Sequence, residues 1–318
     1  MGAQTPIRLN ACRRADAGSL GEGMTLRVGY LGGTLTPEFR TLRERKNAVL
    51  VALYGPDRGE AAQVAAETGA APYDSADALV REAELDALFL NLPPAEEARL
   101  ACAAAERRLP TFVVPPVAPS FAEAEEVLST IRRTGVITSV GWLMRYAINL
   151  IQLRQAVRAR GARWLLGRVV AGVVSEEELL NKAAGVCDLV RYVGGPFDGD
   201  RAIDAPGEGI LHVRLGLVSG ATAQVSLVAG WSAGEEVSIE ALAGGDRMAW
   251  YFGTNHIVIN GREQRVAEKV EGLYVAEVAA FLTAVETGRR SPVLCDYAEA
   301  VETLRVTDAL RQAWEHGT

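Results

Sequence analysis

The chain has 318 residues, about twice the length of an average domain, so we expect two domains with separate cores. Hydrophobic residues make up 49% and charged residues 23%, and the net charge is -7, which excludes fibrous and disordered classes and any general attraction for nucleic acid. All apolar runs are shorter than the roughly 20 residues that a membrane-spanning helix needs, and the N-terminus lacks the apolar core of a signal peptide. We therefore expect a cytoplasmic protein with neither a membrane nor a nucleic-acid partner.

Residues 1–23 are polar, rich in Gly and Ala and without a regular period, and we interpret them as a disordered leader. The three histidines and four cysteines are isolated along the chain, without the spacing of metal-ligand motifs. No metal site is expected, and few side chains remain as candidates for proton transfer.

Short apolar runs alternate with helical stretches from residue 25 onward. The runs place Val and Leu at successive positions, which predicts strands buried on both faces of a parallel sheet. They are Leu26 to Leu31, Val49 to Tyr54, Leu85 to Leu90, Thr111 to Val114 and Val136 to Val140. Between them, apolar residues recur at helical spacing in residues 61–69, 76–82, 95–108 and 121–134. This alternation predicts an α/β domain over residues 24–142, with a Rossmann-like, doubly wound parallel sheet.

The pattern changes after about residue 146. Strand-like segments, often alternating, are Leu165 to Val174, Gly209 to Val218, Ala221 to Ala229, Glu236 to Leu242, Arg247 to Phe252 and His256 to Ile259. Helical stretches flank them at Glu176 to Val193, Leu273 to Thr287 and Tyr297 to Trp314. We therefore predict an α+β domain over residues 143–318, with a mostly antiparallel open sheet and helices packed on one face.

A glycine-rich segment follows the first strand, where a dinucleotide-binding fold places its phosphate-binding turn. Its candidate cofactor-binding residues are Gly29, Gly32, Gly33 and Thr34. The Cβ of Thr34 would crowd a backbone that has to approach a pyrophosphate closely. Thr36 as N-cap and Pro37 at the first helical position predict a late helix start, which weakens phosphate binding further. The pattern also fits an ordinary strand-to-helix turn without a cofactor.

The second strand ends at Gly55, where a carboxylate would normally bind the adenosine ribose hydroxyls. Without that carboxylate, Arg58 could instead meet a 2′-phosphate. If either cofactor binds, NADP is slightly favoured over NAD.

Five segments together carry a resemblance to a known family. They are Leu26-Arg-Val-Gly-Tyr-Leu-Gly32, Leu85-Asp-Ala-Leu-Phe-Leu-Asn-Leu-Pro93, Val140-Gly-Trp-Leu-Met-Arg-Tyr146, Cys187-Asp-Leu-Val-Arg-Tyr-Val-Gly194, and a helix-rich segment beginning near Tyr274. In this order and spacing the chain resembles the Gfo/Idh/MocA family, named from glucose-fructose oxidoreductase, inositol dehydrogenase and a rhizopine catabolism protein. The resemblance implies NAD(P)-dependent chemistry on sugars, cyclitols and related compounds, and it places Asn91 and Pro93 at the cofactor.

The same resemblance assigns catalytic positions whose chemistry is missing here. The family's Glu-Lys-Pro motif falls on Val114-Pro115-Pro116, so its lysine is replaced by Pro115. Its Asp and His, four apart on a helix, and a further Asp three later fall on Asn181, Gly185 and Asp188. Spacings of four and three put these three positions on one helix face. Arg145 and Tyr146 remain as groups that would line the pocket.

Two residues on that helix bear on whether other groups replace the lost ones. Lys182 lies about 100° around the helix from Asn181, so we expect it to face elsewhere. Gly185 costs about 1 kcal/mol relative to Ala inside a helix. It either lets another backbone approach or hollows out a ligand pocket.

These observations favour a divergent oxidoreductase-family protein whose interdomain cleft binds a nucleotide cofactor, a sugar-like or other small ligand, or both. The alternatives are a redox-inactive ligand-binding or regulatory protein and a non-redox enzyme on the same scaffold. We expect no appreciable turnover of polyols or sugars, and a homo-oligomer formed through the open sheet of the second domain.

Overall fold

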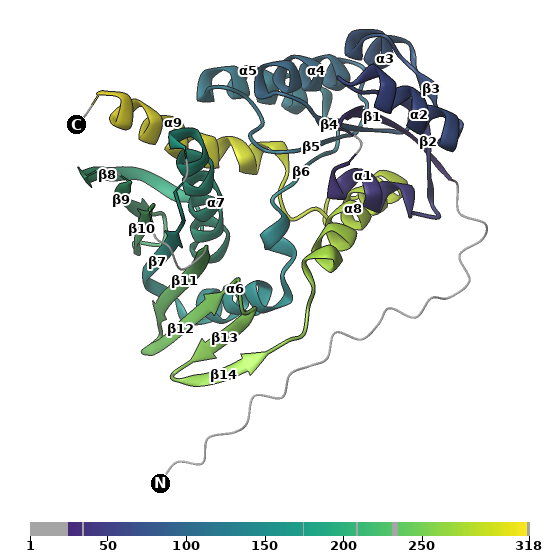
Figure 1. Ribbon diagram of the computed structural model, residues 1–318. Helices are drawn as coiled ribbons and strands as arrows, with labels where there is room; N and C mark the ends of the chain where they lie inside the picture. Colours follow the sequence, from purple (N-terminus) through teal and green to yellow (C-terminus); the bar gives the residue numbers. More distant parts are fainter. Residues whose placement is uncertain (1–24, 34, 174, 208, 231–234, 317–318) are drawn as a thin grey trace.

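The computed structural model describes residues 25–33, 35–173, 175–207, 209–230 and 235–316. The predicted disordered leader, residues 1–23, and Thr34 therefore lie outside the described residues. The chain forms two separate β-sheets, with helices interleaved (Figure 1). The predicted fold class, a Rossmann-like domain followed by an α+β region, is confirmed.

The first sheet has six strands in the order β3-β2-β1-β4-β5-β6, and its strand pairs are parallel. Its strands are β1 Leu26–Gly32, β2 Ala48–Tyr54, β3 Ala71–Pro72, β4 Ala87–Asn91, β5 Thr111–Val113 and β6 Thr138–Val140. Two apolar clusters cover its two faces, which explains the unbroken Val and Leu runs. The strand order reverses between β1 and β4, the place where ligands bind in such sheets.

Short helices connect these strands. They are α1 Pro37–Arg43, α2 Arg58–Thr68, α3 Ala76–Glu82, α4 Pro94–Glu106 and α5 Phe121–Thr134. Thr36 caps α1 by accepting from the backbone N–H of Phe39, and Pro37 is the first helical residue, so the predicted late start of this helix is confirmed. Ser120 caps α5 in the same way, by accepting from the backbone N–H of Glu123.

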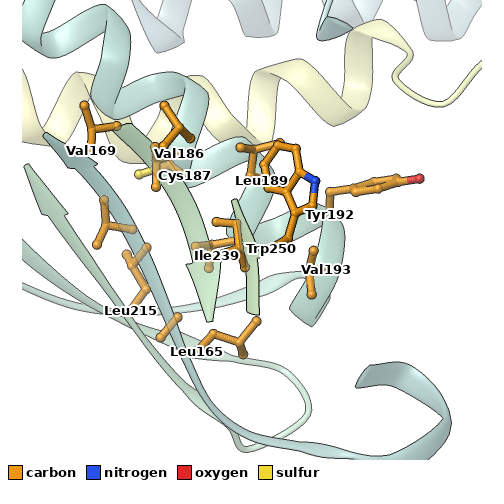
Figure 2. Packing of buried hydrophobic residues seen from close by; sticks show 14 of the residues in the cluster. Leu165, Val169, Val186, Cys187, Leu189, Tyr192, Val193, Leu215, Ile239 and Trp250 are labelled. Atoms are coloured by element: carbon orange, nitrogen blue, oxygen red, sulfur yellow. The ribbon is translucent and has the colours of Figure 1, made fainter. Parts of the chain in front are cut away.

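The second sheet has eight strands in the order β14-β13-β12-β11-β7-β10-β9-β8, and only β7 and β10 pair in parallel among the described residues. Its strands are β7 Ala162–Val170, β8 Phe197–Gly207, β9 Ile210–Leu217, β10 Thr222–Val228, β11 Glu236–Ala243, β12 Asp246–Tyr251, β13 His256–Ile259 and β14 Arg262–Arg265. Two helices, α6 Ile148–Arg160 and α7 Glu176–Gly194, pack on one face. Figure 2 shows side chains of α7, such as Val186 and Leu189, packed against strand residues of this core.

The last two helices correct one part of the prediction. We expected all C-terminal helices to pack on the second sheet, but α8 Val270–Thr287 packs on the first, beside α1 (Figure 1). Phe281 of α8 contacts the stacked rings of Phe89 and Phe112 from β4 and β5. The helix α9 Tyr297–His316 divides its apolar residues between the cores of both sheets. The apolar spacing of a helix indicates a buried face and leaves the partner sheet open.

Candidate functional site

The glycine turn lies at the carboxyl end of β1. Gly32 pairs with Asn91 at the end of β4, and its φ of +146° is one that side-chain-bearing residues rarely adopt. A Cβ on Gly32 would lie 2.4 Å from the carbonyl oxygen of Asn91, so the close approach of these strands requires glycine. A Cβ on Gly33 would meet nothing within 4 Å. The backbone at Gly33 is therefore open on the side where a dinucleotide fold receives its pyrophosphate.

A buried tyrosine, Tyr30, which the sequence analysis did not single out, is hydrogen-bonded to this turn. The Tyr30 hydroxyl donates to the Gly33 carbonyl at 3.1 Å and lies 2.8 Å from the Thr36 hydroxyl. Asn91 donates to the same hydroxyl at 3.5 Å. Burial raises the pKa of Tyr30 to about 12, so its proton stays available for these contacts. The tyrosine side chain fixes the turn by linking it to the start of α1.

The end of β2 lies against the same turn. A Cβ on Gly55 would lie 3.4 Å from the carbonyl oxygen of Gly32, which places the two predicted cofactor positions together. Asp57 is engaged as the N-cap of α2, accepting from Glu60 N–H. Arg58 follows it with a side chain that is 80% exposed and 3.8 Å from Asp74. Such a guanidinium can turn toward a bound phosphate because little holds it in place.

Two other predicted cofactor positions have structural roles. Gly29 lies inside β1, where a Cβ would lie 2.6 Å from Leu85, so the prediction that it belongs to the turn is wrong. Because Gly29 has no side chain, Leu85 can pack closely against β1 at this position. Pro93 is the N-cap of α4, next to a buried acid, Glu97. One carboxylate oxygen of Glu97 accepts from Leu92 N–H at 3.0 Å, and burial raises the pKa of this carboxyl to about 9.

The family's lysine position lines a small cavity between the two halves of the molecule. Pro115 and Pro116, joined by a cis peptide bond, line this cavity of about 170 Å³ together with Trp142 and Asn181. Helices α7 and α9 supply most of the remaining lining. The loop after β5 therefore brings the positions of Pro115 and Asn181 together, as the resemblance implies, without an ammonium or a carboxylate.

A second cavity, of about 350 Å³, lies on the other side of Asn181. Gly185 lines it, and a Cβ there would lie 3.8 Å from the indole of Trp142 and meet nothing else within 4 Å. This residue thus opens space toward the cavity instead of admitting another backbone. Lys182 lines the same cavity, so the prediction that it faces elsewhere is wrong. Its ammonium lies 2.6 Å from a carboxylate oxygen of Glu235.

The position of Lys182 at the cavity could have been predicted from its spacing to Gly185. Lys182 lies three residues before Gly185, so these two residues share a helix face. Asn181, the residue before Lys182, points about 100° away from it. The cavity is wide enough to be lined from both directions. Glu235, separated by 53 residues along the chain, could not be paired with Lys182 from sequence spacing.

Asp188 and Arg145 form a buried ion pair, and the prediction that Arg145 lines the reactive pocket is not supported. The Arg145 guanidinium donates to both carboxylate oxygens of Asp188, at 2.8 and 2.6 Å, and both side chains are 1% exposed. Thr303 of α9 donates to the same carboxylate at 3.0 Å. Arg145 also donates to the Leu294 carbonyl at 2.6 Å. These bonds join α7, α9 and the short 3₁₀ helix Leu143–Tyr146.

Tyr146 is likewise part of the scaffold. It is 7% exposed, and its hydroxyl accepts from the backbone N–H of Leu294 at 3.2 Å. Burial raises the pKa of Tyr146, which disfavours its ionisation. Of the predicted catalytic positions, Pro115, Asn181 and Gly185 thus line cavities, whereas Asp188, Arg145 and Tyr146 hold the helices together.

A comparison with protein-family models finds a match over the residues of the first sheet. Residues 26–142 match the family model described as "Oxidoreductase family, NAD-binding Rossmann fold" of Gfo/Idh/MocA proteins. These residues belong to the Gfo/Idh/MocA family. The resemblance inferred from the sequence is therefore confirmed, and the glycine turn described above is part of an NAD-binding Rossmann fold.

The chain is also similar to several named proteins. The chain is 28% identical over 142 residues to the dehydrogenase aclE of Aspergillus oryzae, a match covering 43% of this chain. That match spans 36% of the curated relative, about a third of its length. Solved structures extend the likeness to nearly the whole chain. UDP-N-acetylglucosamine 3-dehydrogenase GnnA from Acidithiobacillus ferrooxidans has a TM-score of 0.77 at 20% identity, covering 91% of this chain and 97% of that one.

The second structure is an oxidoreductase from Agrobacterium radiobacter in complex with NAD+, L-tartaric acid and magnesium. Its TM-score is 0.77 at 14% identity, with 93% of this chain and 98% of that one covered. At these identities the likeness shows the fold alone. Within the described residues, no group of three or more His, Cys, Asp or Glu side chains could hold a metal ion. None of the helices described is both long and apolar enough to cross a membrane.

Proposed function

We propose that this protein binds NAD(P) at the glycine turn and a small polar ligand in the cavities beside Asn181, as a divergent oxidoreductase-family member without the family's usual proton-transfer groups. The observation that carries the proposal is the close approach of Gly32, Asn91 and Gly55 at the carboxyl edge of the first sheet. This edge is where a Rossmann fold receives its cofactor.

The turn fits a dinucleotide in the residues that the structure describes. Gly33 leaves open space, Tyr30 fixes the turn, and Arg58 stands exposed at the start of the helix after β2. Bound NAD(P) would supply hydride transfer. Because Gly55 offers no carboxylate for the ribose hydroxyls, we propose that NADP is slightly preferred to NAD.

The ligand would lie where the two cavities meet at Asn181. Their lining is largely apolar, with polar groups from Asn181, Lys182 and Glu178 in the larger cavity. The indole Nε1 of Trp142, in the smaller one, has no hydrogen-bond partner among the described residues. Apolar walls with a few convergent polar groups are typical of small-molecule sites.

The missing groups predict weak catalysis on the family's usual substrates. Removing a hydride from an alcohol carbon also requires a base for the hydroxyl proton. Neither Pro115 nor Gly185 can accept a proton, and the Asn181 amide is not a useful base. Loss of general acid–base catalysis costs about 10² to 10⁴ in rate.

The Lys182–Glu235 pair favours a second candidate function, the reduction of a carbonyl ligand. An ammonium lining the cavity can donate a hydrogen bond to the carbonyl oxygen and give up a proton as hydride arrives at the carbon. Glu235 would hold the amine in place, since the two groups lie 2.6 Å apart. This role keeps the protein an oxidoreductase, with its acid on a different residue from the one the family uses.

Fluorescence titration of the purified protein with NADH and NADPH tests the primary proposal. We expect saturable binding of both, with NADPH tighter, and a loss of that preference in Arg58→Ala because the guanidinium that meets the 2′-phosphate is gone. Binding of neither nucleotide up to millimolar concentration would exclude NAD(P) as the cofactor. The NADH measurement on the same variant serves as the control for folding.

The second candidate is tested by NAD(P)H-dependent reduction of a panel of sugar ketones and aldehydes. Lys182→Met is expected to lower kcat while Lys269→Met, at an exposed position before α8, leaves it unchanged. Equal rates in both variants would leave Lys182 without a role in proton transfer.

We further propose that the protein is cytoplasmic and forms a homo-oligomer through the face of the second sheet opposite α6 and α7. This face carries mixed side chains such as Arg168, His212 and Gln224. Light scattering coupled to chromatography is expected to give a mass above the 34.0 kDa of one chain. A strictly monomeric species at micromolar concentration would refute this assembly.

A further inference from the structure

An arginine-lined cavity lies away from the proposed cofactor and ligand sites. It measures about 480 Å³ and shares no lining residue with the two cavities at Asn181. Its walls come from α6, the last turns of α7 and the connection between α8 and α9. On α7 it begins at Arg191, six residues beyond Gly185, which is about 9 Å along the helix axis.

Positive charge dominates the lining. The arginines are Arg145, Arg154, Arg158, Arg191 and Arg290, and the acids are Asp296 and Glu299. Both carboxylates are already engaged. Glu299 accepts from two of the arginines, at 3.1 and 2.6 Å, and Asp296 accepts from the backbone N–H of Glu299 at 2.9 Å. The five arginines outnumber these two acids and Asp188, the buried partner of Arg145, so the lining keeps a net positive charge.

Three of the arginines have no carboxylate partner among the described residues. Arg154 and Arg158 both donate to one backbone oxygen, the Tyr192 carbonyl, at 3.1 and 3.0 Å. Arg290, from the connection between α8 and α9, donates to the Gly135 carbonyl at 2.7 Å and to the Val136 carbonyl at 3.3 Å. Each guanidinium has five N–H donors, so most of their donor capacity is unused by the contacts in the structure.

The wall between them is preorganised. The guanidinium of Arg154 stacks over the Tyr192 ring at 4.5 Å, and Figure 2 shows that ring pointing away from the other labelled side chains of the core. Arg191 is 5% exposed, and its Nε has no hydrogen-bond partner among the described residues. Burial lowers the pKa of Arg158, and the neighbouring Arg154 lowers it further. Holding these cations together thus has a cost that a bound anion would remove.

We propose that this cavity is a binding site for a small oxyanion of the phosphate or polycarboxylate class, held by Arg154, Arg158 and Arg290. Guanidinium groups bind carboxylate and phosphate oxygens bidentately, which matches the unused donors of three arginines that line one cavity. A volume of about 480 Å³ admits a small metabolite carrying such a group. Contacts with backbone carbonyls account for one nitrogen of each of these arginines, on Tyr192 for Arg154 and Arg158 and on Gly135 and Val136 for Arg290. They leave the other donors of the three side chains unused around one cavity.

Calorimetric titration of the full chain with inorganic phosphate and with citrate, at constant ionic strength set by potassium chloride, tests this site. We expect one of the two anions to bind, and its identity names the class. Removing two charge-assisted donors in Arg154→Gln/Arg158→Gln should weaken binding at least about 10-fold. The matched control is Arg27→Gln, which removes an exposed arginine paired with Glu84 on the first sheet and should leave binding unchanged.

Arg290→Gln provides a second variant that leaves the Tyr192 carbonyl contacts intact. It should also weaken binding, and it decides the question if the double variant does not fold. Binding of neither anion up to about 10 mM, an affinity weaker than that of ordinary metabolite sites, overturns the proposal. Binding that is equal in the unaltered chain, Arg290→Gln and any folded double variant overturns it as well.

Discussion

The two halves of α7 differ in what their side chains do. Toward its N-terminus, Asn181 and Gly185 line a cavity. Toward its C-terminus, Asp188 is buried, paired with Arg145 and bonded to Thr303. The packing depends on Asp188, where the resemblance implies a retained residue, whereas the two positions where it implies a change line cavities. A family residue retained at a site position is thus no proof of retained chemistry.

The largest expected effect comes from breaking the buried half. Asp188→Ala removes the buried carboxylate partner of Arg145 and leaves it only the partly exposed Glu299. Loss of a buried partner costs about 3 to 5 kcal/mol. Asn181→Ala, on the exposed half, should change the free energy of unfolding by less than about 0.5 kcal/mol. Urea denaturation followed by tryptophan fluorescence measures both. Similar losses in the two variants would erase the difference between the halves.

The next largest effect is expected from introducing the family's catalytic residues at the three positions where the resemblance implies that they are missing. The unaltered chain should show no appreciable dehydrogenase turnover on a polyol panel under saturating NAD or NADP. Pro115→Lys, Asn181→Asp and Gly185→His together should raise the rate about 100-fold, the low end of general acid–base catalysis. The Trp142 indole, 3.8 Å from a Cβ at position 185, limits the space for the new ring. Turnover of about 1 per second by the unaltered protein would refute the interpretation of a degenerate site.

In the glycine turn, the adjacent residues Gly32 and Gly33 allow a similar comparison between a closely packed and an open position. Gly32→Ala places a Cβ 2.4 Å from the Asn91 carbonyl oxygen at a φ of +146°, whereas Gly33→Ala places one in open space. The first should cost about 1 to 3 kcal/mol in unfolding free energy and weaken NAD(P)H binding. The second should preserve folding and weaken binding alone. If both variants lose stability equally, the strain is not specific to Gly32.

The last expected effect depends on pH and concerns a buried acid with no ion-pair partner among the described residues. Glu97 is 1% exposed, and burial raises its pKa to about 9. The folded protein therefore holds this proton where the unfolded chain releases it near pH 4.3. Stability from this group is lost as pH rises between these values, by at most about 1.4 kcal/mol per pH unit.

Glu97→Gln removes this titration, so the variant should gain stability relative to the unaltered chain between pH 5 and pH 8. Thermal unfolding at several pH values measures the change. Glu96→Gln, at the adjacent position of α4, is the control and should follow the unaltered chain. A pH-independent difference for Glu97→Gln would show that the carboxyl does not hold its proton in the folded state.

Much of the fold could be predicted because each element carries its own local signal. The apolar runs of the first sheet and the late start of α1 follow from neighbouring residues. By contrast, α6, β8 and β14 were missed. The exposed strand β14 has no apolar face, and the apolar residues of α6 are interrupted by arginines.

The site was predicted less completely because its contacts join residues far apart in the sequence. The positions of Gly32, Gly55, Asn181 and Gly185 follow from strand ends and helix spacing. The partners of Lys182 and Asp188 lie more than 50 residues away in Glu235 and Thr303, and no local pattern connects them. The same limit explains why Arg145 was assigned to a pocket and not to a buried pair.

The return of α8 to the first sheet makes the Rossmann unit discontinuous along the chain. Its core needs Phe281 and its neighbours from α8, which the ribosome supplies only after the second sheet has been synthesised. A gene fragment ending near residue 142 would expose the rings of Phe89 and Phe112, and we expect it to aggregate. The second sheet is in effect an insertion between β6 and α8. A fragment that splices these two elements with a short linker is therefore the better starting point for isolating the nucleotide-binding unit.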